Sequence, residues 1–546
     1  MGGDDGTRLT GKSAGTSLTA AEAPQEETSA SPTLGVGSRF RSGGVGDGAA
    51  LAAILVALAF LWGRARGVWY WLDEGLSIGF SSHSIGEIAG LLRQDGSPPL
   101  YYWLLHGWIR LFGSSESATH SLSLVFALGT VVAAWWLGRT LYGRRTAWVL
   151  VVLAAVNPFL ASYANETRMY TLVVLLSTVA TGCFLHVFAF GHRRYLFPFT
   201  VALMLLLYTH NWALLFTLGA LAALVPCVVA SADRRRILLD AVLTFGAAAL
   251  LYAPWVPTLL FQIGHTGAPW SPIPTLDLAR EQVSNLVGGL EAVVAIGLGG
   301  AVGLAAILRR WPSDRHAVAV AAAATIPVVA IVSGWVISRD GSIWASRYLG
   351  AVLPALLLVV AVGLAAGGPT ALASLGVVAF LSAPIDVKTP PYVKSNVRAV
   401  TDEVGPAMQP GDLVISPDYG EIPLLAHYLP PGLRYANAEG LVADPLVADQ
   451  RDATDRLRRV RPQEVLRPLV DAMPVGGRVL LVCPPVSAPS AGDPEFIRLI
   501  MLRCADVDQL LTGAEHLERD LSAPLGTLEV YNTPVNGTVF VRRPPG

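Results

Sequence analysis

Long apolar blocks separated by short polar segments fill the chain between residues 47 and 385, and the two flanking parts lack this pattern. A membrane-spanning helix needs about 20 mostly apolar residues. The blocks predict eleven spans, at roughly 47–63, 119–141, 147–163, 170–190, 195–209, 212–230, 237–258, 286–308, 316–337, 348–366 and 369–385. We therefore expect a polytopic α-helical membrane protein.

The flanking parts differ from each other. Residues 1–46 are rich in Gly, Ser, Thr, Ala and Glu, which predicts a disordered tail. Residues 386–546 contain three strand-like stretches, "GDLVISPD", "GRVLLVCPP" and "GTVFVRR". Helices are predicted near 392–408, 420–429, 462–473 and 494–512. The chain therefore divides into a tail (1–46), a transmembrane domain (47–385) and a C-terminal α/β domain (386–546).

Basic residues in short loops predict the orientation, because cytoplasmic loops carry an excess of Lys and Arg. With the amino terminus in the cytoplasm, the inside loops hold Arg144, Arg145, Arg193, Arg194, Arg234, Arg235, Arg236, Arg309, Arg310 and Arg315. Arg64 and Arg66 lie outside and count against this assignment. An odd number of spans places the C-terminal domain outside, in a multi-pass protein of the plasma membrane.

Composition agrees with this class, since 53% of residues are hydrophobic and 14% are charged, against about 25% charged in soluble domains. The net charge of −1 gives no sign of a nucleic-acid partner. Cys183 and Cys227 lie in apolar blocks and are expected to be packing residues. Cys483 and Cys504 form either a disulfide or two buried thiols, and the sequence leaves both open.

The segment 64–118 is predicted to lie outside the membrane core. "HSIGEIAGLLRQ" carries apolar residues on one helical face, as expected for a helix in the membrane interface. "SPPLYYWLLHGWIRLFG" predicts a second interfacial or re-entrant helix that begins after Pro98-Pro99. The alternative is a twelfth span, which we disfavour because it would reverse the charge pattern of the loops that follow.

Charged residues at the outer helix ends form the candidate site. Asp73 and Glu74 offer a carboxylate that can take a proton from a hydroxyl, although an acidic pair is also ordinary at a solvated loop end. Glu166 is a second carboxylate that would raise the pKa of a neighbouring acid, orient an acceptor or hold a cation; alternatively, Glu166 and Arg168 are ordinary helix-end charges in the headgroup layer. Arg347 suits a phosphate group or snorkels to lipid headgroups. His210 is either a phosphate or cation contact or a structural hydrogen-bonding residue.

Six motifs in order give a specific resemblance: "LDEG", "SPPLYYWLLHGWIRLFG", "YANETRMY", "YTHNW", "YAPWVP" and "ASRYLGAVLP". Over roughly residues 47–385 the chain resembles the GT-C superfamily of integral-membrane glycosyltransferases, in the branch of the protein O-mannosyltransferases, the aminoarabinose transferase of lipid A and the Rgt-type enzymes. The family's acidic pair matches Asp73 and Glu74, its second outer carboxylate matches Glu166, and its phosphate-contacting arginine matches Arg347.

Two positions depart from the family pattern. "ATHSLSL" offers His120 where many relatives carry an arginine, and Gly96-Ser97 precede the double proline where relatives often have His or Glu. Asp95 is then the nearest polar candidate. The expected donor-phosphate residues are Arg347, Arg168 and His210, and the expected substrate-binding residues are Tyr170, Tyr348 and Asp95.

The resemblance implies an inverting transfer from a polyprenyl-phosphate sugar to an acceptor hydroxyl on the outer face, with Asp73 as general base. The sugar stays open, as does the acceptor, which is a glycan, a glycolipid or a protein. No cofactor or metal site is predicted, and a divalent cation remains an open alternative. A lipid or sugar transporter or flippase is the second functional class. It is disfavoured because acidic residues are almost absent from mid-span positions.

Overall fold

The computed structural model describes residue 2 and residues 44–64, 68–341, 343–382, 392–485, 492–523 and 529–544. The predicted tail, 1–46, lies almost entirely outside the described residues. By backbone contacts the chain divides into two compact units, 1–51 and 52–546. Helix α1 (Gly44–Gly63) contains the boundary, and all other elements belong to the second unit.

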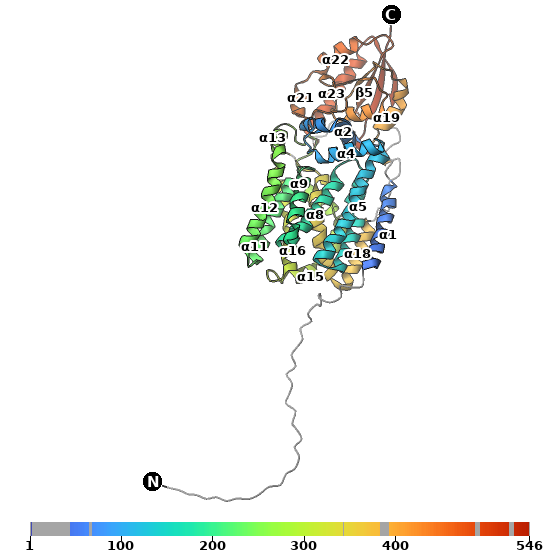
Figure 1. Cartoon of the computed structure of the whole chain (residues 1–546). Coiled ribbons are helices and arrows are strands. Elements are labelled where there is room, and N and C mark those ends of the chain that lie inside the picture. The colour runs from blue at the N-terminus through green and yellow to red at the C-terminus, as the bar shows by residue number, and fades with distance from the viewer. Residues whose placement is uncertain are drawn as a thin grey trace. The chain divides into compact units, whose positions relative to one another are not determined.

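A helical bundle makes up most of the second unit (Figure 1). Its helices are α5 (Glu116–Leu141), α6 (Arg144–Ala155), α7 (Pro158–Tyr163), α8 (Tyr170–Phe188), α9 (Leu196–Leu207), α10 (Ala213–Ala222), α11 (Leu224–Ala230), α12 (Arg234–Tyr252), α13 (Val256–His265), α14 (Leu276–Asn285), α15 (Leu290–Leu308), α16 (Arg315–Ile337), α17 (Leu353–Ala366) and α18 (Gly368–Ser382). Short 3-10 turns η2 (Arg193–Tyr195), η3 (Ala253–Trp255) and η4 (Ser346–Ala351) connect some of them.

The prediction of a polytopic helical membrane protein is confirmed. Seven helical segments among the described residues are long and apolar enough to cross a membrane, and each coincides with a predicted span. The predicted spans at 147–163, 195–209, 348–366 and 369–385 correspond to shorter helices, and residues 383–385 lie outside the described residues. The number eleven therefore stays a prediction.

Local capping explains one of the shorter helices. The block 147–163 is apolar throughout, but α6 ends at Ala155 and α7 restarts at Pro158. The side chain of Asn157 accepts a hydrogen bond from the Leu160 amide at 3.2 Å, and proline is well suited to the first turn that follows. A hydropathy pattern alone does not reveal this break between α6 and α7.

Both helices predicted between the first two spans are present. They follow α2 (Leu72–Ser82) and consist of α3 (Ile85–Leu91) with η1 (Leu92–Gln94), and α4 (Leu100–Phe112). Helix α4 has 13 residues and begins directly after the two prolines, so it is shorter than the roughly 20 residues of a full span.

The C-terminal region, which we define as the described residues from 392 onward, is α/β as predicted. Its strands are β1 (Tyr392–Ser395), β2 (Leu413–Ile415), β3 (Arg434–Asn437), β4 (Gly440–Leu441), β5 (Arg478–Cys483), β6 (Leu517–Ala523), β7 (Glu529–Thr533) and β8 (Asn536–Arg542). Its helices are α19 (Val397–Val404), η5 (Gly405–Ala407), α20 (Glu421–Tyr428), α21 (Ala453–Arg459), α22 (Pro462–Asp471) and α23 (Glu495–Thr512).

Six of these strands form one sheet in the order β4-β3-β2-β5-β8-β6, and β1 pairs separately with β7. The three predicted strands are β2, β5 and β8. The helix predicted over 392–408 is wrong at its start, because residues 392–395 form β1 and pair in parallel with β7. Cys483 at the end of β5 and Cys504 in α23 form a disulfide with a Cα–Cα distance of 5.9 Å, which decides between the two open alternatives.

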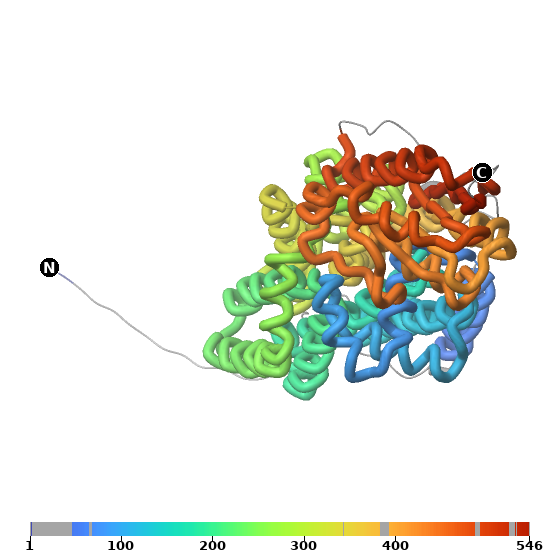
Figure 2. Tube along the Cα trace, turned by 90° about the horizontal axis from the view of Figure 1, so that it is seen from above, coloured from blue at the N-terminus to red at the C-terminus, as the bar shows by residue number. Residues whose placement is uncertain are grey.

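The C-terminal region packs on the segment that contains α2 (Figures 1 and 2). Tyr70 and Ile78 share one apolar core with residues of β2, α19 and α20. A Cβ atom at Gly75 would lie 2.7 Å from Cβ of Leu424 in α20, so glycine is needed for this close approach. Glu116 at the start of α5 adds polar contacts, since it accepts from Arg398 at 2.7 Å and from the Tyr428 hydroxyl at 3.0 Å.

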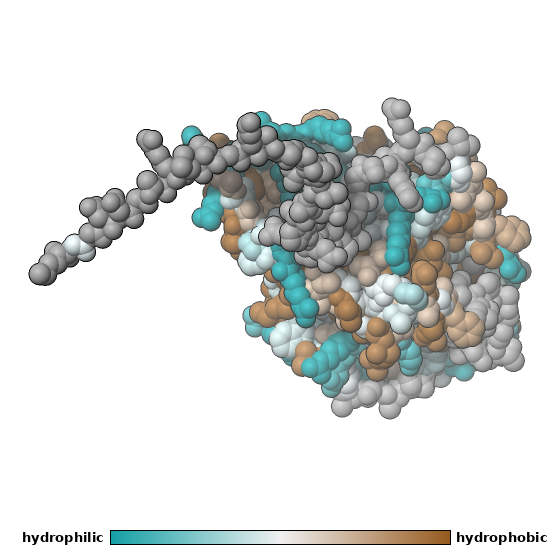
Figure 3. All heavy atoms as spheres, turned by 90° about the horizontal axis from the view of Figure 1, so that it is seen from below, coloured by the Kyte–Doolittle hydropathy of each residue, from teal (hydrophilic) through white to brown (hydrophobic). Residues whose placement is uncertain are grey.

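The arginine-bearing loops gather at the other end of the bundle. Helix α5 has 26 residues and is therefore roughly 39 Å long. Beyond its far end, the Tyr142 hydroxyl donates to the carbonyl of His316 at 3.1 Å, and Arg236 donates to the carbonyl of Gly191 at 3.2 Å. Figure 3 views the molecule from this side, where hydrophilic groups lie between hydrophobic ones.

Candidate active site

The first turn of α2 holds the two predicted carboxylates in different environments. Glu74 is 2% exposed. Its carboxylate accepts from the backbone amide of Trp71 at 3.3 Å and from that of Thr167 at 2.6 Å, and it lies 2.7 Å from Nε2 of His120. The contact with Trp71 caps the helix, and the other two tie α2 to α5 and to the loop before α8. Both carboxylate oxygens of Glu74 therefore have partners that stabilise the fold.

Asp73 faces two arginines instead. Its Oδ2 lies 3.5 Å from Nη2 of Arg347 and 3.9 Å from Nε of Arg168. These distances bring the charges together without a hydrogen bond, and Oδ2 of Asp73 has no hydrogen-bond partner. The Nε atoms of Arg347 and Arg168 are likewise buried without one. Three groups of strong hydrogen-bonding capacity thus remain unsatisfied in one place, which is unusual for buried polar atoms.

Arg168 is held by the loop between α7 and α8. Its Nη1 donates to the carbonyl of Asp73 at 3.2 Å and to the Ser77 hydroxyl at 3.0 Å. Ser123 of α5 donates to the carbonyl of Glu166 at 2.6 Å, which fixes the same loop. The sequence "YANETRMY" therefore delivers its carboxylate and its arginine to the start of α2.

Arg347 lies in η4, the turn before α17. Its guanidinium carbon is 4.2 Å from the ring centroid of Trp270 and 5.7 Å from the centroids of Trp71 and Tyr348. Arginine stacks well on aromatic faces. The aromatic rings hold Arg347 beside Asp73 while leaving part of its hydrogen-bonding capacity free.

Glu166 is paired with a residue that the sequence did not single out. It is 1% exposed and binds Nζ of Lys394, on β1 of the C-terminal region, in a close ion pair. Its other oxygen accepts from the indole Nε1 of Trp71 at 3.2 Å. Burial raises the pKa of the Glu166 carboxyl, and the lysine opposes this effect. Neither Lys394 nor Trp71 belongs to a pattern that sequence reading recognises.

His210, Tyr170 and Tyr348 form an aromatic cluster next to the arginines. The His210 ring centroid lies 4.7 Å from that of Tyr348 and 6.1 Å from that of Tyr170. Nδ1 of His210 is 3.1 Å from the amide nitrogen of Trp212, which donates to it. Burial lowers the pKa of His210 to about 3, helped by Arg168 and Arg347. The imidazole is therefore neutral, with its proton on Nε2 available for donation.

Asp95 lies in the turn before α4. Burial raises the pKa of its carboxyl, while the positive charge of Arg168 opposes the effect. All nine predicted site residues thus lie at the junction of α2, the loop before α8 and η4, or in electrostatic contact with it. Glu74 and Glu166 differ from Asp73 in having hydrogen-bond partners on both oxygens.

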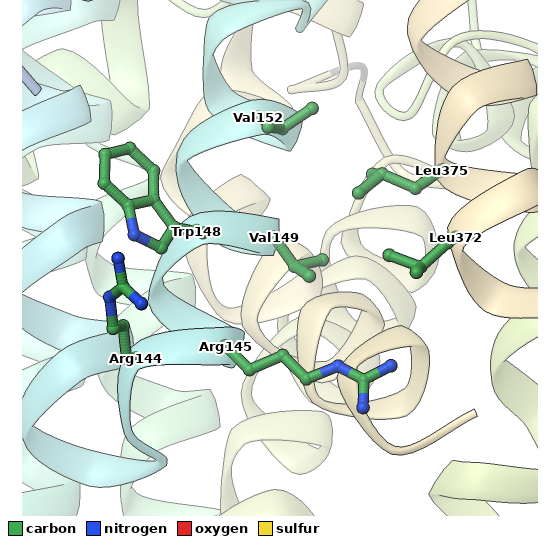
Figure 4. A pocket seen from close by; sticks show the side chains of 7 residues that line it. All are labelled: Arg144, Arg145, Trp148, Val149, Val152, Leu372 and Leu375. Carbon is green, nitrogen blue, oxygen red and sulfur yellow. The ribbon is translucent and has the colours of Figure 1, made fainter. Parts of the chain in front are cut away.

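No group of three or more His, Cys, Asp or Glu side chains that could hold a metal ion occurs in the part of the chain that the structure describes. A groove of about 450 Å³ lies elsewhere, between α6 and α18, lined by Arg144, Arg145, Trp148, Val149, Val152, Leu372 and Leu375 (Figure 4). It is at the arginine-bearing end of the bundle and is not part of the site.

Comparison with known proteins identifies the fold. Residues 96–261 match the family model of the dolichyl-phosphate-mannose-protein mannosyltransferases. ArnT from Cupriavidus metallidurans in the apo state has 13% identity, a TM-score of 0.58, and coverage of 92% of this chain and 100% of its own. ArnT bound to undecaprenyl phosphate has 12% identity with the same TM-score and coverage.

The arabinofuranosyltransferase AftD from Mycobacteria also matches, with 12% identity, a TM-score of 0.50, and coverage of 91% of this chain and 40% of its own. No curated protein matches the sequence. The predicted resemblance is confirmed by the family model and by the fold: the chain is similar to the GT-C membrane glycosyltransferases, and the enzyme class that its motifs predicted, a membrane glycosyltransferase, is confirmed.

Proposed function

We propose that this protein transfers a sugar from a polyprenyl-phosphate donor to an acceptor hydroxyl, with inversion at the anomeric carbon. The observation that carries the proposal is the position of Asp73 between Arg347 and Arg168, with Oδ2 and both Nε atoms lacking hydrogen-bond partners. A phosphate group would satisfy the guanidinium donors, and an acceptor hydroxyl would satisfy the carboxylate.

The reaction needs one displacement. The acceptor oxygen bonds to the anomeric carbon while the bond from that carbon to the phosphate oxygen breaks, and Asp73 takes the hydroxyl proton as general base. The leaving polyprenyl phosphate gains a negative charge, which Arg347 and Arg168 stabilise. Nε2 of His210 is a third donor for the phosphate.

The remaining candidates have supporting roles in this proposal. Glu74 fixes the start of α2 and so the direction of Asp73. Glu166 holds the indole of Trp71 through the hydrogen bond at 3.2 Å. Tyr170, Tyr348 and Asp95 border the arginines and are assigned to substrate binding.

We place the site and the α/β domain (386–546) outside the cytoplasm and the tail (1–46) inside, with the catalytic domain at 47–385. This orientation rests on the arginine-bearing loops, which lie at the end of the bundle far from the site and match the positive-inside rule. A reporter active only outside the cytoplasm should give signal after Arg398 and none after Arg235. The reverse result would invert the orientation.

The polyprenyl donor is supported by ArnT, a protein of the same fold that has been solved with undecaprenyl phosphate. The acceptor is a glycan, a glycolipid or a protein hydroxyl. A transporter or flippase remains the second class. It would move the lipid-linked sugar without forming a new glycosidic bond.

The deciding experiment supplies membranes containing this protein with a panel of radiolabelled polyprenyl-phosphate sugars and follows the label. Transfer of one sugar to a new product, absent with Asp73→Asn, is expected. Movement of intact donor across the membrane without a new product would support the transporter instead.

A further inference from the structure

The C-terminal region supplies a lysine side chain to the candidate site. Lys394 extends from β1 and forms an ion pair with Glu166, 228 residues earlier in the chain. The lysine side chain is 23% exposed and that of Glu166 is 1% exposed. A carboxylate with so little access to water is unstable as an ion unless a cation lies beside it.

Lys394 and Arg347 approach the same indole. Nζ of Lys394 lies 5.1 Å from the Trp71 ring centroid, and the guanidinium carbon of Arg347 lies 5.7 Å from it. Trp71 itself donates to Glu166. Two cations thus lie near one aromatic ring, with Lys394 bound to Glu166 and Arg347 beside Asp73.

This distribution of charge has a consequence for the arginines. Without Lys394, Glu166 would be a buried carboxylate that has lost its cation, and Arg347 is a guanidinium that approaches the same indole. Arg347 has unused hydrogen-bonding capacity and would be drawn toward the carboxylate. An arginine that binds Glu166 is no longer free to bind a phosphate.

We propose that Lys394 is a positioning residue of the active site, which neutralises Glu166 so that Arg347 and Arg168 stay available for the phosphate of a polyprenyl-phosphate ligand. The inference rests on the proposed function. It makes the C-terminal region a part of the site, so that the membrane-embedded helices alone hold an incomplete phosphate-binding site.

A second ion pair provides a control for the alternative that Lys394 only attaches the C-terminal region to the helices. Arg398 of α19 binds Glu116 of α5 at 2.7 Å and so joins the same two parts of the molecule. Among the described residues, its side-chain partners are Glu116, Asp402, Trp69 and Tyr428, and they include neither Asp73 nor the two arginines. If Lys394 only attaches the region, loss of either cation should have the same effect.

The experiment measures binding of undecaprenyl phosphate to the full-length protein in lipid nanodiscs. Lys394→Met should weaken binding about tenfold, as expected for the loss of one charge-assisted contact. Lys394→Met combined with Glu166→Gln should bind within about threefold of Glu166→Gln alone, because no carboxylate is left to neutralise. Lys394→Arg and Arg398→Met should bind like the wild type.

Three results would overturn the proposal. Wild-type affinity of Lys394→Met shows that the arginines do not depend on the lysine. Equal weakening by Arg398→Met shows that both cations only attach the region. A double variant that is much weaker than Glu166→Gln shows that the lysine acts independently of Glu166, by touching the phosphate itself.

The experiment still gives an answer if a variant does not fold or if the wild-type protein does not bind the ligand. If Lys394→Met does not fold, the comparison of the double variant with Glu166→Gln alone gives the answer, since both lack the buried carboxylate. If the wild-type protein does not bind undecaprenyl phosphate at all, the proposed function fails, and this result is distinct from a failure at Lys394.

Discussion

Helices α2 and α20 pack against each other, and acidic residues mark the start of both, yet the two sets of carboxyl groups have opposite surroundings. In α2, Asp73 lies within 4 Å of two arginines. At α20, Asp418 and Glu421 form no salt bridge among the described residues. Burial raises the pKa of Asp418 to about 6, with Asp73 adding to the effect, and raises that of Glu421 well above its usual value.

The difference shows what makes a buried carboxyl group useful for proton transfer. A cation beside it keeps the group ionised, whereas burial without a cation keeps its proton in place. Glu421 is 3% exposed, and its Oε2 has no hydrogen-bond partner. We therefore assign chemistry to α2 and packing to α20, although both carry acids at the same junction.

The largest expected effect comes from Asp73. Asp73→Asn is nearly isosteric and removes the proton acceptor, so transfer should fall by about 10²–10⁴-fold, roughly 3–5 kcal/mol in the activation free energy. Donor binding should change little, because the arginines remain. The measurement is the initial rate of sugar transfer at saturating donor.

Asp418→Asn, just before α20, is the matched control, and it should keep most of the activity. Near wild-type transfer by Asp73→Asn would contradict the assignment of the base. If that result came with an inactive Glu74→Gln variant, the base would be the second acid of the pair.

Glu74→Gln should act mainly on stability. Three contacts meet this carboxylate, and two of them come from backbone amides that need an acceptor. An amide group places its NH2 against one of the donors, which should cost about 1–3 kcal/mol of unfolding free energy. Thermal unfolding in detergent should show a lower Tm, while the activity per folded molecule should fall less than in Asp73→Asn. A normal Tm with abolished transfer would instead make Glu74 part of the chemistry.

The next prediction concerns Arg347, a cation beside Asp73 that has no counterpart in the salt bridges described for Asp418 and Glu421. Arg347→Lys keeps the charge but loses the planar fork that binds a phosphate through two hydrogen bonds. The KM for the donor should rise about tenfold, equal to roughly 1.4 kcal/mol. Arg339→Lys is a suitable control, since Arg339 donates to the carbonyl of Pro274 and stacks on Trp335 away from Asp73. Unchanged donor kinetics in Arg347→Lys would reduce Arg347 to a membrane anchor.

Much of the candidate site follows from charges that the sequence already shows. Asp73, Arg168 and Arg347 are charges at helix ends of an apolar chain, and such charges are rare unless they have a function. The positive-inside pattern places all three on one side, which made their proximity an expectation. The distances between these three charges could not be predicted. Nor could the contrast between Asp73 and Glu74, because the two are neighbours in the sequence and only the folded structure shows that Glu74 contacts His120 and Thr167.

Lys394 and the acids of α20 could not be predicted in the same way. A lysine in a strand of a polar region is ordinary, and its role depends on how that region packs on α2. The sequence "SPDYGEIP" likewise contains acids that look solvated. Glu421 is buried at the junction where α20 packs closely on α2, since an added Cβ at Gly420 would lie 2.7 Å from Cδ2 of Leu72. Such contacts between regions far apart in sequence leave no local pattern.

The smallest expected effect concerns Glu421 and the pH dependence of stability. In the unfolded chain this carboxyl ionises with a pKa near 4.3, and in the folded protein burial holds the pKa well above that value. As the pH rises from about 4.3 toward the folded pKa, the unfolded state loses its proton first and is stabilised relative to the folded state. The stability present at low pH is therefore lost as the pH increases. Glu421→Gln stays neutral at every pH and removes this loss, so its Tm relative to that of the wild type should increase as the pH rises above about 4.3. A Glu421→Gln variant that is less stable than the wild type at pH 8 would mean that this carboxyl is ionised and paired, and the contrast between α2 and α20 would no longer hold.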